Sequence, residues 1–241
     1  FTSTILFLTC LVGFIACKSN DKIIKEDQKI NTLTKIEKNQ GWKLLFDGES
    51  LEGWKSYNGG SISGWKVVEG VLHNSGKGSD HGGDIVTEEQ FNDFELSLEW
   101  KTTSQSNSGI FYHVQESVVD AIYKSGLEYQ LADDEGRAAS SRNKNQITGA
   151  LYGMVAPQNA AVRSLEKWNS SKIIVRGAHV EHWLNGEKVV ETELWTDDWY
   201  ANKKTSKWKD EPYYGEAKKG HIGLQDHGGL TTFRNIKLRE L

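Results

Sequence analysis

The stretch that decides the fold is Val180-Glu181-His182-Trp183-Leu184-Asn185-Gly186-Glu187-Lys188-Val189. Two runs of mixed polar and apolar residues flank an Asn-Gly pair, and this dipeptide is a strong signal for a two-residue turn between antiparallel strands. The segment therefore predicts a β-hairpin, and the rest of the chain can be compared with it.

Short alternating runs recur from Gly41 onward, and convincing helical patterns are absent. The predicted strands are Trp42–Phe46, Trp65–Val68, Val71–His73, Phe94–Trp100, Gly109–Val114, Gly126–Ala132, Ala150–Met154, Lys172–Arg176, Val180–Leu184, Glu187–Glu193, His221–Gln225 and Thr231–Leu238. Thr87–Phe91 and Asp197–Ala201 are predicted to form single helical turns. Many short strands without an internal repeat favour an all-β sandwich or jelly roll of two sheets over a propeller.

The composition limits the classes of function. The 241 residues carry a net charge of −4 and include nine Trp, 24 Gly and two Cys. A negative charge argues against a general nucleic-acid-binding surface. The chain has no Walker loop, no Gly-x-Ser-x-Gly elbow and no His-Glu-x-x-His motif, which excludes nucleotide-binding, serine-hydrolase and zinc-protease classes.

Residues 1–17 are uncharged and hold both cysteines, Cys10 and Cys17. The apolar run from Ile5 to Ala16 is too short to span a bilayer and is typical of an export signal, which we expect to be truncated at its start. Phe14-Ile15-Ala16-Cys17 resembles a bacterial lipobox and predicts lipidation of Cys17. The alternatives are an ordinary cleaved signal peptide and a short buried helix.

The polar, Lys-rich segment Lys18–Gln40 is predicted to be a flexible tether of charge +2. The remaining domain, Gly41–Leu241, has a charge of −6 and no cysteine. Disulfides, cysteine-based zinc sites and a thiol nucleophile are therefore excluded for this domain. Its expected location is the periplasm or cell surface, where a lipid anchor provides its only contact with the membrane.

Two strands carry polar groups on one face. In Leu127-Glu128-Tyr129-Gln130-Leu131, the period of two places Glu128 and Gln130 opposite an apolar face, as a sandwich cleft requires. In the second strand, Gln225 and His227 point away from Ile222 and Leu224, and Asp226 is expected either to orient His227 or to satisfy a local turn. Plain solvent exposure of Glu128 and Gln130 is the alternative.

The remaining histidines and loops are less specific. His182 shares a face with apolar neighbours and is either a core histidine or a cleft residue, whereas His113 is a candidate for a cleft floor. The loop from Gly78 to Asp84 offers oxygen ligands for Ca²⁺ but lacks the order of an EF-hand. Asp133–Gln146 and Trp195–Lys219 are the longest irregular stretches, and the second forms either a sugar-binding rim or a loop that buries its own aromatic residues.

A resemblance covers nearly all of the domain. The matching motifs are Gly41-Trp42-Lys43-Leu44-Leu45-Phe46-Asp47-Gly48, Leu51-Glu52-Gly53-Trp54, Phe94-Glu95-Leu96, Glu99-Trp100, Asn107-Ser108-Gly109-Ile110, Gly126-Leu127-Glu128-Tyr129-Gln130, Gly149-Ala150-Leu151-Tyr152, Lys167-Trp168-Asn169, His182-Trp183-Leu184-Asn185-Gly186, Leu224-Gln225-Asp226-His227-Gly228 and Phe233-Arg234-Asn235-Ile236. In order and spacing they resemble the 3-keto-disaccharide hydrolase domain family. The resemblance implies a concanavalin-like jelly roll and cleavage of glycosides whose glucose unit is oxidised at carbon 3.

This chemistry defines the expected site. A carbonyl at carbon 3 acidifies the hydrogen on carbon 2, so a base can remove it and the enolate can expel the group on carbon 1. Glu128 or His227 is expected as the base, His182 or His113 as the acid, and Asp226 as the group that orients His227. Binding roles are expected for Gln130, Tyr152, Gln225, Trp195, Trp199 and Trp208.

Three further possibilities stay open. A divalent cation, if one stabilises the enolate, is expected on Glu128 and the histidines. A non-catalytic carbohydrate-binding module on the same fold is the second functional class, and a purely structural lipoprotein domain is the third. The expected partner in the first two classes is an oligosaccharide or glycoside.

Overall fold

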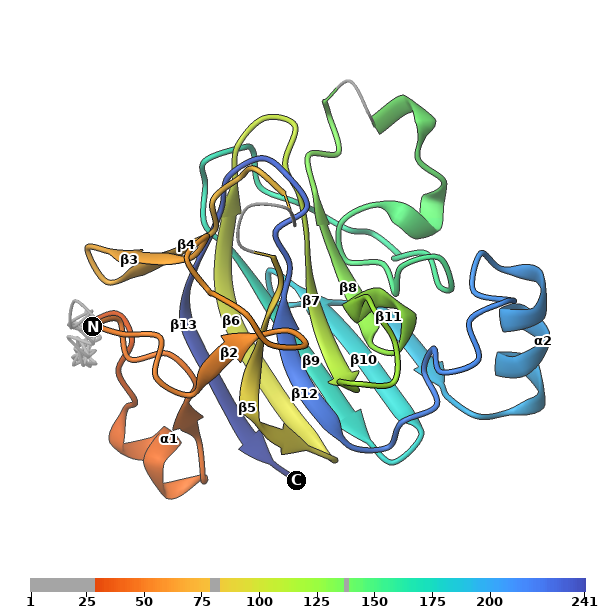
Figure 1. Ribbon diagram of the computed structural model, residues 1–241, viewed down its shortest axis with the longest axis horizontal. Helices are drawn as coiled ribbons and strands as arrows, with labels where there is room; N and C mark the ends of the chain where they lie inside the picture. The colour runs from red at the N-terminus through yellow and green to blue at the C-terminus, as the bar shows by residue number, and fades with distance from the viewer. Residues whose placement is uncertain (1–28, 79–82, 137–138) are drawn as a thin grey trace, which may run out of the picture.

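The computed structural model describes residues 29–78, 83–136 and 139–241 (Figure 1). The predicted export signal with Cys17, the first part of the predicted tether and residues 79–82 of the predicted Ca²⁺ loop lie outside the described residues. Within the described ranges, no helix combines the length and the apolar character needed to cross a membrane.

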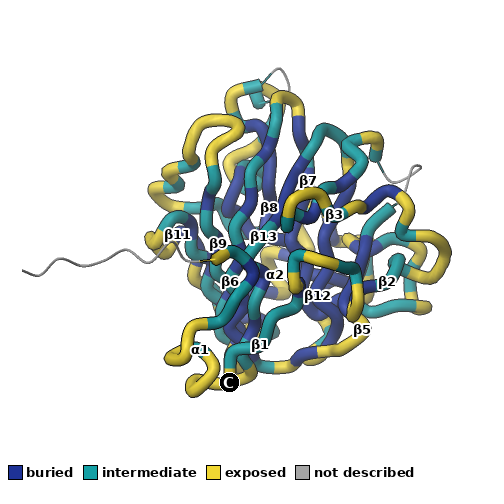
Figure 2. The backbone as a smooth tube through the Cα atoms, turned by 90° about the vertical axis from the view of Figure 1, so that its left-hand side faces the viewer, coloured by how far each residue is buried: buried dark blue, intermediate teal, exposed yellow. Residues whose placement is uncertain are grey.

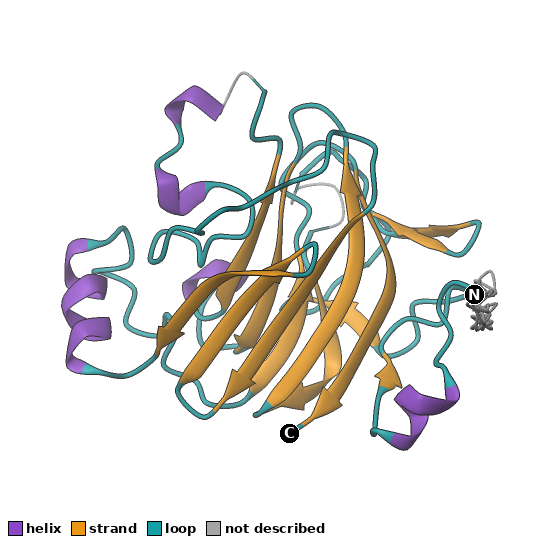
Figure 3. Ribbon diagram, turned by 180° about the vertical axis from the view of Figure 1, so that it is seen from behind, coloured by secondary structure: helices purple, strands orange, loops and turns teal. Residues whose placement is uncertain are grey.

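Two antiparallel sheets pack face to face, as predicted for a sandwich. The larger has the strand order β11-β10-β9-β6-β13-β4-β3, with β1 also paired to β13, and the smaller has the order β2-β5-β12-β7-β8. The larger sheet faces the viewer in Figure 3. The strands are β1 (Lys43–Leu44), β2 (Trp54–Ser56), β3 (Lys66–Val68), β4 (Val71–His73), β5 (Ile85–Phe91), β6 (Phe94–Thr102), β7 (Asn107–Val114), β8 (Leu127–Ala132), β9 (Asn169–Arg176), β10 (His179–Leu184), β11 (Glu187–Glu193), β12 (Gly220–Leu224) and β13 (Thr231–Glu240).

The main core lies between the sheets. Alternate residues of each strand supply it, for example Leu127, Tyr129 and Leu131 from β8 and Val180 and Leu184 from β10. In Figure 2 the buried stretches run through the interior and the exposed ones form the outer loops. Burial of this apolar area provides most of the free energy that stabilises the sandwich.

The predicted hairpin is present as β10 and β11. Asn185 has a φ of 51° and Gly186 a φ of 91°, which are the positive angles that a tight hairpin turn of this type requires. A β-bulge between His182 and Trp183 shifts the register against β11, but the pairing of β10 with β9 is regular.

Three local predictions need correction. Thr87–Phe91 belongs to β5 and forms no helical turn, because this segment pairs with both β2 and β12. Ala150–Met154 is not a strand: Leu151 makes only isolated bridges to Tyr129 and Val155. The predicted turn at Asp197–Ala201 extends into a helix, α2 (Asp197–Thr205), whose N-terminus is capped by the Thr196 side chain.

The described half of the predicted tether is folded onto the domain. Asn31 is 6% exposed, its backbone N–H donates to Asn235 Oδ1 at 2.6 Å, and its own Oδ1 accepts from the Asn235 N–H at 2.8 Å. A short helix follows, α1 (Lys35–Asn39), and its Glu37 pairs with Lys237 of β13. The polar side chains of residues 29–40 thus make specific hydrogen bonds and an ion pair to the domain, where a flexible tether was predicted.

Candidate active site

The smaller sheet has a second buried face that points away from the larger sheet. On β8, Glu128 and Gln130 lie on this outer face because Leu127, Tyr129 and Leu131 fill the core. A pocket of about 270 Å³ opens above them and is called here the Glu128 pocket. Its lining residues are Asn107, Tyr123, Glu128, Gln130, Tyr152, Lys207, Trp208, Gln225 and His227.

Glu128 is the most unusual group in this pocket. The residue is 4% exposed, and its carboxyl makes no hydrogen bond to any described residue. Burial raises the pKa of Glu128 to about 8; the positive charge of Lys207 opposes this shift and the negative charge of Asp84 adds to it. Near neutral pH the side chain can therefore either accept or donate a proton.

Gly109 on the neighbouring strand β7 makes room for this carboxyl. A Cβ atom at position 109 would lie 2.5 Å from Glu128 Oε1 and 2.9 Å from its Cγ. Residue 109 pairs with Gln130 on β8, so the glycine lies directly beside the polar face. The sequence Asn107-Ser108-Gly109 thus contributes an empty space to the site.

Backbone and amide hydrogen bonds hold the floor of the pocket. Gln130 Nε2 donates to Asn107 Oδ1 at 2.9 Å, and the Tyr152 N–H donates to the Glu128 carbonyl at 3.0 Å. The irregular segment at residues 150–154, predicted as a strand, therefore still runs beside β8 and places Tyr152 at the pocket.

The wall of the pocket is a stack of aromatic rings from the Trp-rich loop, residues 195–219. The ring centroids of Trp208 and Tyr214 lie 4.2 Å apart with an angle of 9° between the ring planes, and Trp199 also stacks on Tyr214, with centroids 6.3 Å apart. Trp208 Nε1 donates to the Tyr152 carbonyl at 2.9 Å. Lys207 lies over the rings of Tyr152 and Trp208, with Nζ at 4.4 and 4.6 Å from their centroids.

A second pocket of about 520 Å³ adjoins the first and is called here the Asp84 pocket. The two pockets share Tyr123, Gln225 and His227 as lining residues. Burial raises the pKa of Asp84 to about 7; a hydrogen bond from the backbone of Asp226 opposes the shift and the charge of Asp226 adds to it. The remaining lining residues are Ser56, Tyr57, Gly59, Ser61, Gly83, Asp84, Asp120, Ala121, Ile122 and Asp226.

The Asp226 carboxylate binds residues 74–78 and does not orient His227. Its carboxylate accepts hydrogen bonds from Asn74 Nδ2, from the N–H and hydroxyl of Ser75 and from the N–H of Gly78. The side chain is 0% exposed. The turn interpretation is thus nearer to the structure, although the bonded groups lie far away in sequence.

Two predicted histidines lie outside both pockets. His182 is fully buried between the sheets, with Nε2 at 3.0 Å from the Tyr112 hydroxyl and Nδ1 at 3.0 Å from the Gly149 carbonyl, and burial lowers its pKa to about 4. His113 packs against Phe94, its Nε2 bonds the Asn92 carbonyl, and burial lowers its pKa. Neither ring can reach a molecule in the Glu128 pocket.

Of the three tryptophans predicted to bind sugar, one lines the Glu128 pocket and two do not. Trp208 lines the Glu128 pocket, but Trp199 is 3% exposed behind Tyr214, and Trp195 donates its Nε1–H to the Gly215 carbonyl under Lys218. The interpretation of this loop as one that buries its own aromatic residues therefore holds for Trp199, Trp208 and Tyr214, whereas Tyr200 and Tyr213 are exposed.

Among the lining residues that sequence reasoning missed are Asn107, Tyr123 and Lys207 of the Glu128 pocket and Asp84 of the Asp84 pocket. Asn107 stands in one of the family motifs, Asp84 closes the predicted Ca²⁺ loop, and Lys207 lies in the Trp-rich loop. The sequence therefore gives a weak indication of a role for each of these three residues. Tyr123 has none, since its place depends on Ile122, which fits into the space left by Gly223 on β12.

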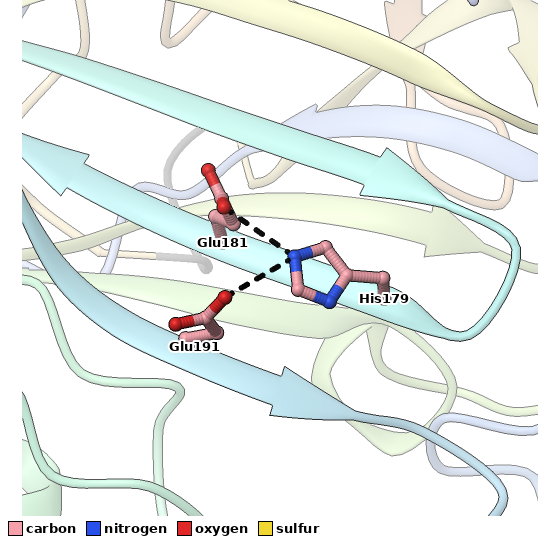
Figure 4. Close-up of side chains that lie close together, drawn as sticks. All are labelled: His179, Glu181 and Glu191. Carbon is pink, nitrogen blue, oxygen red and sulfur yellow. Dashed lines mark hydrogen bonds and ion pairs between the residues drawn. The ribbon is translucent and has the colours of Figure 1, made fainter.

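The donors expected for a divalent cation are not assembled at Glu128. In the described part of the chain, the three His or acidic donor atoms that lie within 4.8 Å of one another belong to His179, Glu181 and Glu191, on the outer face of the larger sheet (Figure 4). There the ammonium group of Lys188 already bonds Glu181 at 3.1 Å and Glu191 at 2.8 Å. This cluster is an ion-pair network that a lysine neutralises in part.

Comparison with known proteins places the chain among sugar-acting enzymes. The sequence profile of the 3-keto-alpha-glucoside-1,2-lyase-like domain matches residues 41–239. A Bacteroides thetaiotaomicron protein named 3-keto-disaccharide hydrolase is 34% identical over 230 residues, which cover 83% of this chain and 79% of that protein.

Solved structures agree on the architecture. A Parabacteroides distasonis protein, provisionally named a glycosyl hydrolase, is 38% identical with a TM-score of 0.83, and the match covers 88% of this chain and 100% of that chain. A second protein of the same organism and provisional name is 31% identical with a TM-score of 0.68, over 83% of this chain and 99% of that chain.

Proposed function

This chain belongs to the 3-keto-alpha-glucoside-1,2-lyase-like domain family, and we propose that its Glu128 pocket cleaves 3-keto-glycosides by elimination followed by hydration. The chain is a glycoside-cleaving enzyme that acts on 3-keto sugars, as its named relative indicates. The observation that carries the proposed route is a buried carboxyl without a hydrogen-bond partner among the described residues, next to a lysine, in a pocket that a sugar ring can enter.

The reaction needs two proton transfers and one charge stabiliser. A base takes the hydrogen on carbon 2, the electron pair forms the carbon 1–carbon 2 double bond, and the bond from carbon 1 to the glycosidic oxygen breaks. The leaving oxygen takes a proton from an acid. Water then adds its hydroxyl to carbon 1 and a proton to carbon 2, so the net change is hydrolysis.

Glu128 and His227 are the groups that divide these proton transfers. Both line the Glu128 pocket, whereas His182 and His113 lie elsewhere. A carboxylate whose pKa is raised to about 8 is a stronger base than an exposed one, and each positioned proton-transfer group contributes roughly 10²–10⁴ in rate.

Lys207 is the group that stabilises the enolate. Its ammonium is held over the Tyr152 and Trp208 rings at the same pocket and acts on Glu128 electrostatically. A fixed cation beside an oxygen that gains negative charge lowers the barrier most in a site with little water. Asn107, Gln130 and Gln225 offer amide groups to the sugar hydroxyls.

The direct experiment is turnover of a 3-keto-disaccharide by Glu128→Gln. We expect a loss of roughly 10²–10⁴-fold, because the amide cannot take the proton from carbon 2. Glu181→Gln, on the outer face of the larger sheet, is the matched control and should keep parental turnover. Near-parental turnover by Glu128→Gln would remove Glu128 from the mechanism.

Reaction in D₂O tests the elimination route separately. Elimination and hydration place a solvent deuteron on carbon 2 of the released 3-keto-glucose, whereas direct displacement at carbon 1 leaves the original hydrogen there. The released sugar incubated alone in D₂O corrects for spontaneous exchange. Release without deuterium at carbon 2 contradicts the proposed route.

We also propose that the chain is exported and carries lipid on Cys17, which places it at the periplasm or cell surface. The support is the uncharged apolar run before this cysteine. Labelling cells with an alkyne fatty acid should mark the parent protein and not Cys17→Ser. Equal labelling of both proteins contradicts the proposal.

A further inference from the structure

The two pockets form one cleft with a shared wall. Tyr123, Gln225 and His227 line both, so a molecule longer than the Glu128 pocket must pass them to enter the Asp84 pocket. Tyr123 is held there because the neighbouring Ile122 is buried against Phe111 and Val86 on the outer face of the smaller sheet. Its ring lies 6.3 Å from that of Trp208.

The sizes of the pockets differ in a way that suits two sugar units. The Glu128 pocket, at about 270 Å³, is just below the ~300–1,000 Å³ that is typical of sites for drug-sized ligands. The Asp84 pocket, at about 520 Å³, lies within that range. One ring in the first pocket thus leaves space for a larger group in the second.

The Asp84 pocket is chemically selective. Its lining includes the carboxyl groups of Asp84, Asp120 and Asp226, and no Lys or Arg is among its described lining residues. Asp120 pairs with Lys124 at 2.8 Å, and Asp226 is occupied by residues 74–78. Asp84 accepts one hydrogen bond from a described residue, the Asp226 N–H at 3.1 Å, and keeps its second carboxyl oxygen for a ligand. Carboxyl oxygens accept hydrogen bonds from hydroxyl groups and repel anions.

We propose that the Asp84 pocket is the leaving-group subsite, that it takes a neutral hydroxyl-bearing unit such as a second sugar, and that His227 on the shared wall protonates the leaving oxygen. This inference rests on the proposed function. The oxidised ring then lies in the Glu128 pocket, and the glycosidic oxygen lies between the pockets, beside His227. His227 is therefore the acid of the elimination step, and Glu128 is its base.

Substrates that differ only in the leaving group test the subsite. The probes are methyl 3-keto-glucoside, a neutral 3-keto-disaccharide, and the same disaccharide with a uronic acid as the leaving ring. We expect kcat/KM for the neutral disaccharide to exceed that of the methyl glycoside by about tenfold or more, which corresponds to about 1.4 kcal/mol or more. The uronic acid substrate should fall below the neutral one, and Asp84→Asn should narrow that gap.

A variant that fills the pocket sharpens this test. Ser61 lines the Asp84 pocket and is exposed, so Ser61→Trp should bring the ratio of disaccharide to methyl glycoside down toward one. Ser63→Trp, two residues away, exposed and outside the lining, is the matched control and should keep the parental ratio. An unchanged ratio in Ser61→Trp, or equal rates on the neutral and anionic disaccharides, overturns the subsite assignment.

The role of His227 has its own test. An acid matters most for a poor leaving group, so His227→Ala should slow the disaccharide far more than 4-nitrophenyl 3-keto-glucoside, whose phenolate leaves unaided. Glu128→Gln should slow both substrates, since both need the base. Equal losses in His227→Ala remove His227 as the acid. If the parent protein cleaves none of these 3-keto substrates, the proposed function itself fails, which is a different outcome from cleavage without discrimination.

Discussion

The outer faces of the two sheets use glutamate in opposite ways. On the larger sheet, Glu95 bonds Arg239 at 2.5 Å and Lys172 at 3.1 Å, and Glu181 accepts from Trp183 at 2.7 Å and Lys188 at 3.1 Å. On the smaller sheet, Glu128 is more deeply buried and has no hydrogen-bond partner among the described residues. Both faces are strand surfaces of one sandwich, so the secondary structure does not cause the difference.

The difference separates stabilising carboxylates from a reactive one. Burial alone would raise the pKa of Glu181, but hydrogen bonds from Trp183, Lys188 and His179 outweigh burial and lower it. At Glu128 burial has the largest effect on the pKa, and the charge of Lys207 offsets only part of it. A carboxyl whose surroundings destabilise its ionised form is expected at positions where the residue serves a reaction and does not stabilise the fold.

The largest expected effect on stability comes from Glu128→Gln. The pKa of Glu128 rises from 4.5 when unfolded to about 8 when folded, so ionisation costs the folded state on the order of 5 kcal/mol above pH 8, at about 1.4 kcal/mol per unit. The variant should therefore unfold at higher denaturant than the parent at pH 9, with the difference vanishing below about pH 4.5. A variant less stable than the parent at pH 9 contradicts the unpaired, buried state of Glu128.

Glu95→Gln should have the next largest effect, with the opposite sign. The Glu95 side chain is 9% exposed and serves two cations, so its loss should cost roughly 1–3 kcal/mol. Urea unfolding at pH 7 measures this cost, and Glu99→Gln, which breaks a single and more exposed pair with Arg234, is the control with a smaller expected loss. Equal stability of Glu95→Gln and the parent would mean that this pair contributes nothing.

Lys207→Met tests the one charge that lowers the pKa of Glu128. Removal of this charge should raise that pKa further, so the rise of kcat/KM with pH should move to higher pH. Lys218→Met, which removes the cation over Trp195, should leave the profile in place. A profile that stays unchanged in Lys207→Met would separate this lysine from Glu128.

Glu181→Gln should have the smallest effect, below about 1 kcal/mol, because exposed ion pairs contribute little. The lowered pKa of Glu181 places its contribution above the unfolded pKa of 4.5, and this contribution is lost as the pH falls through the folded pKa. Thermal unfolding at pH 7 and at low pH, with and without 1 M salt, should show a small loss only at pH 7 in low salt. A loss of the same size at low pH, where the carboxyl of the parent is protonated, would contradict the ion pairs as its cause.

The contrast between the two sheets also explains what the sequence could predict. Because side chains alternate along a strand, the sequence placed Glu128 and Gln130 on the face of their strand opposite the apolar residues. The same rule placed His182 on the apolar face of its own strand. Alternation could not say that the outer face of the smaller sheet is the one that holds a cleft. That depends on the segments at residues 115–126 and 205–215, which reach across from distant parts of the chain.

Asp226 shows a second limit of prediction from sequence, which concerns residues that are adjacent in the chain. Its position next to His227 suggested a catalytic pair, but its partners are Asn74, Ser75 and Gly78, about 150 positions earlier in the chain. Neighbours in sequence point to opposite sides of an extended chain, so adjacency is a poor guide to contact at a strand end. The missed residue Asp84 enters the site through this same long-range packing, because it accepts the Asp226 N–H at 3.1 Å.

The attachment of Asn31 to Asn235 has a consequence for orientation. Residues Lys29 to Thr32 lie against Ser97 and Glu99, on the outer face of the larger sheet, whereas the cleft opens on the outer face of the smaller one. The first described residues, 29–32, therefore lie on the side opposite the cleft. A force applied through residues 29–32 therefore loads β13, which holds Asn31 through Asn235, before it reaches any residue that lines the cleft.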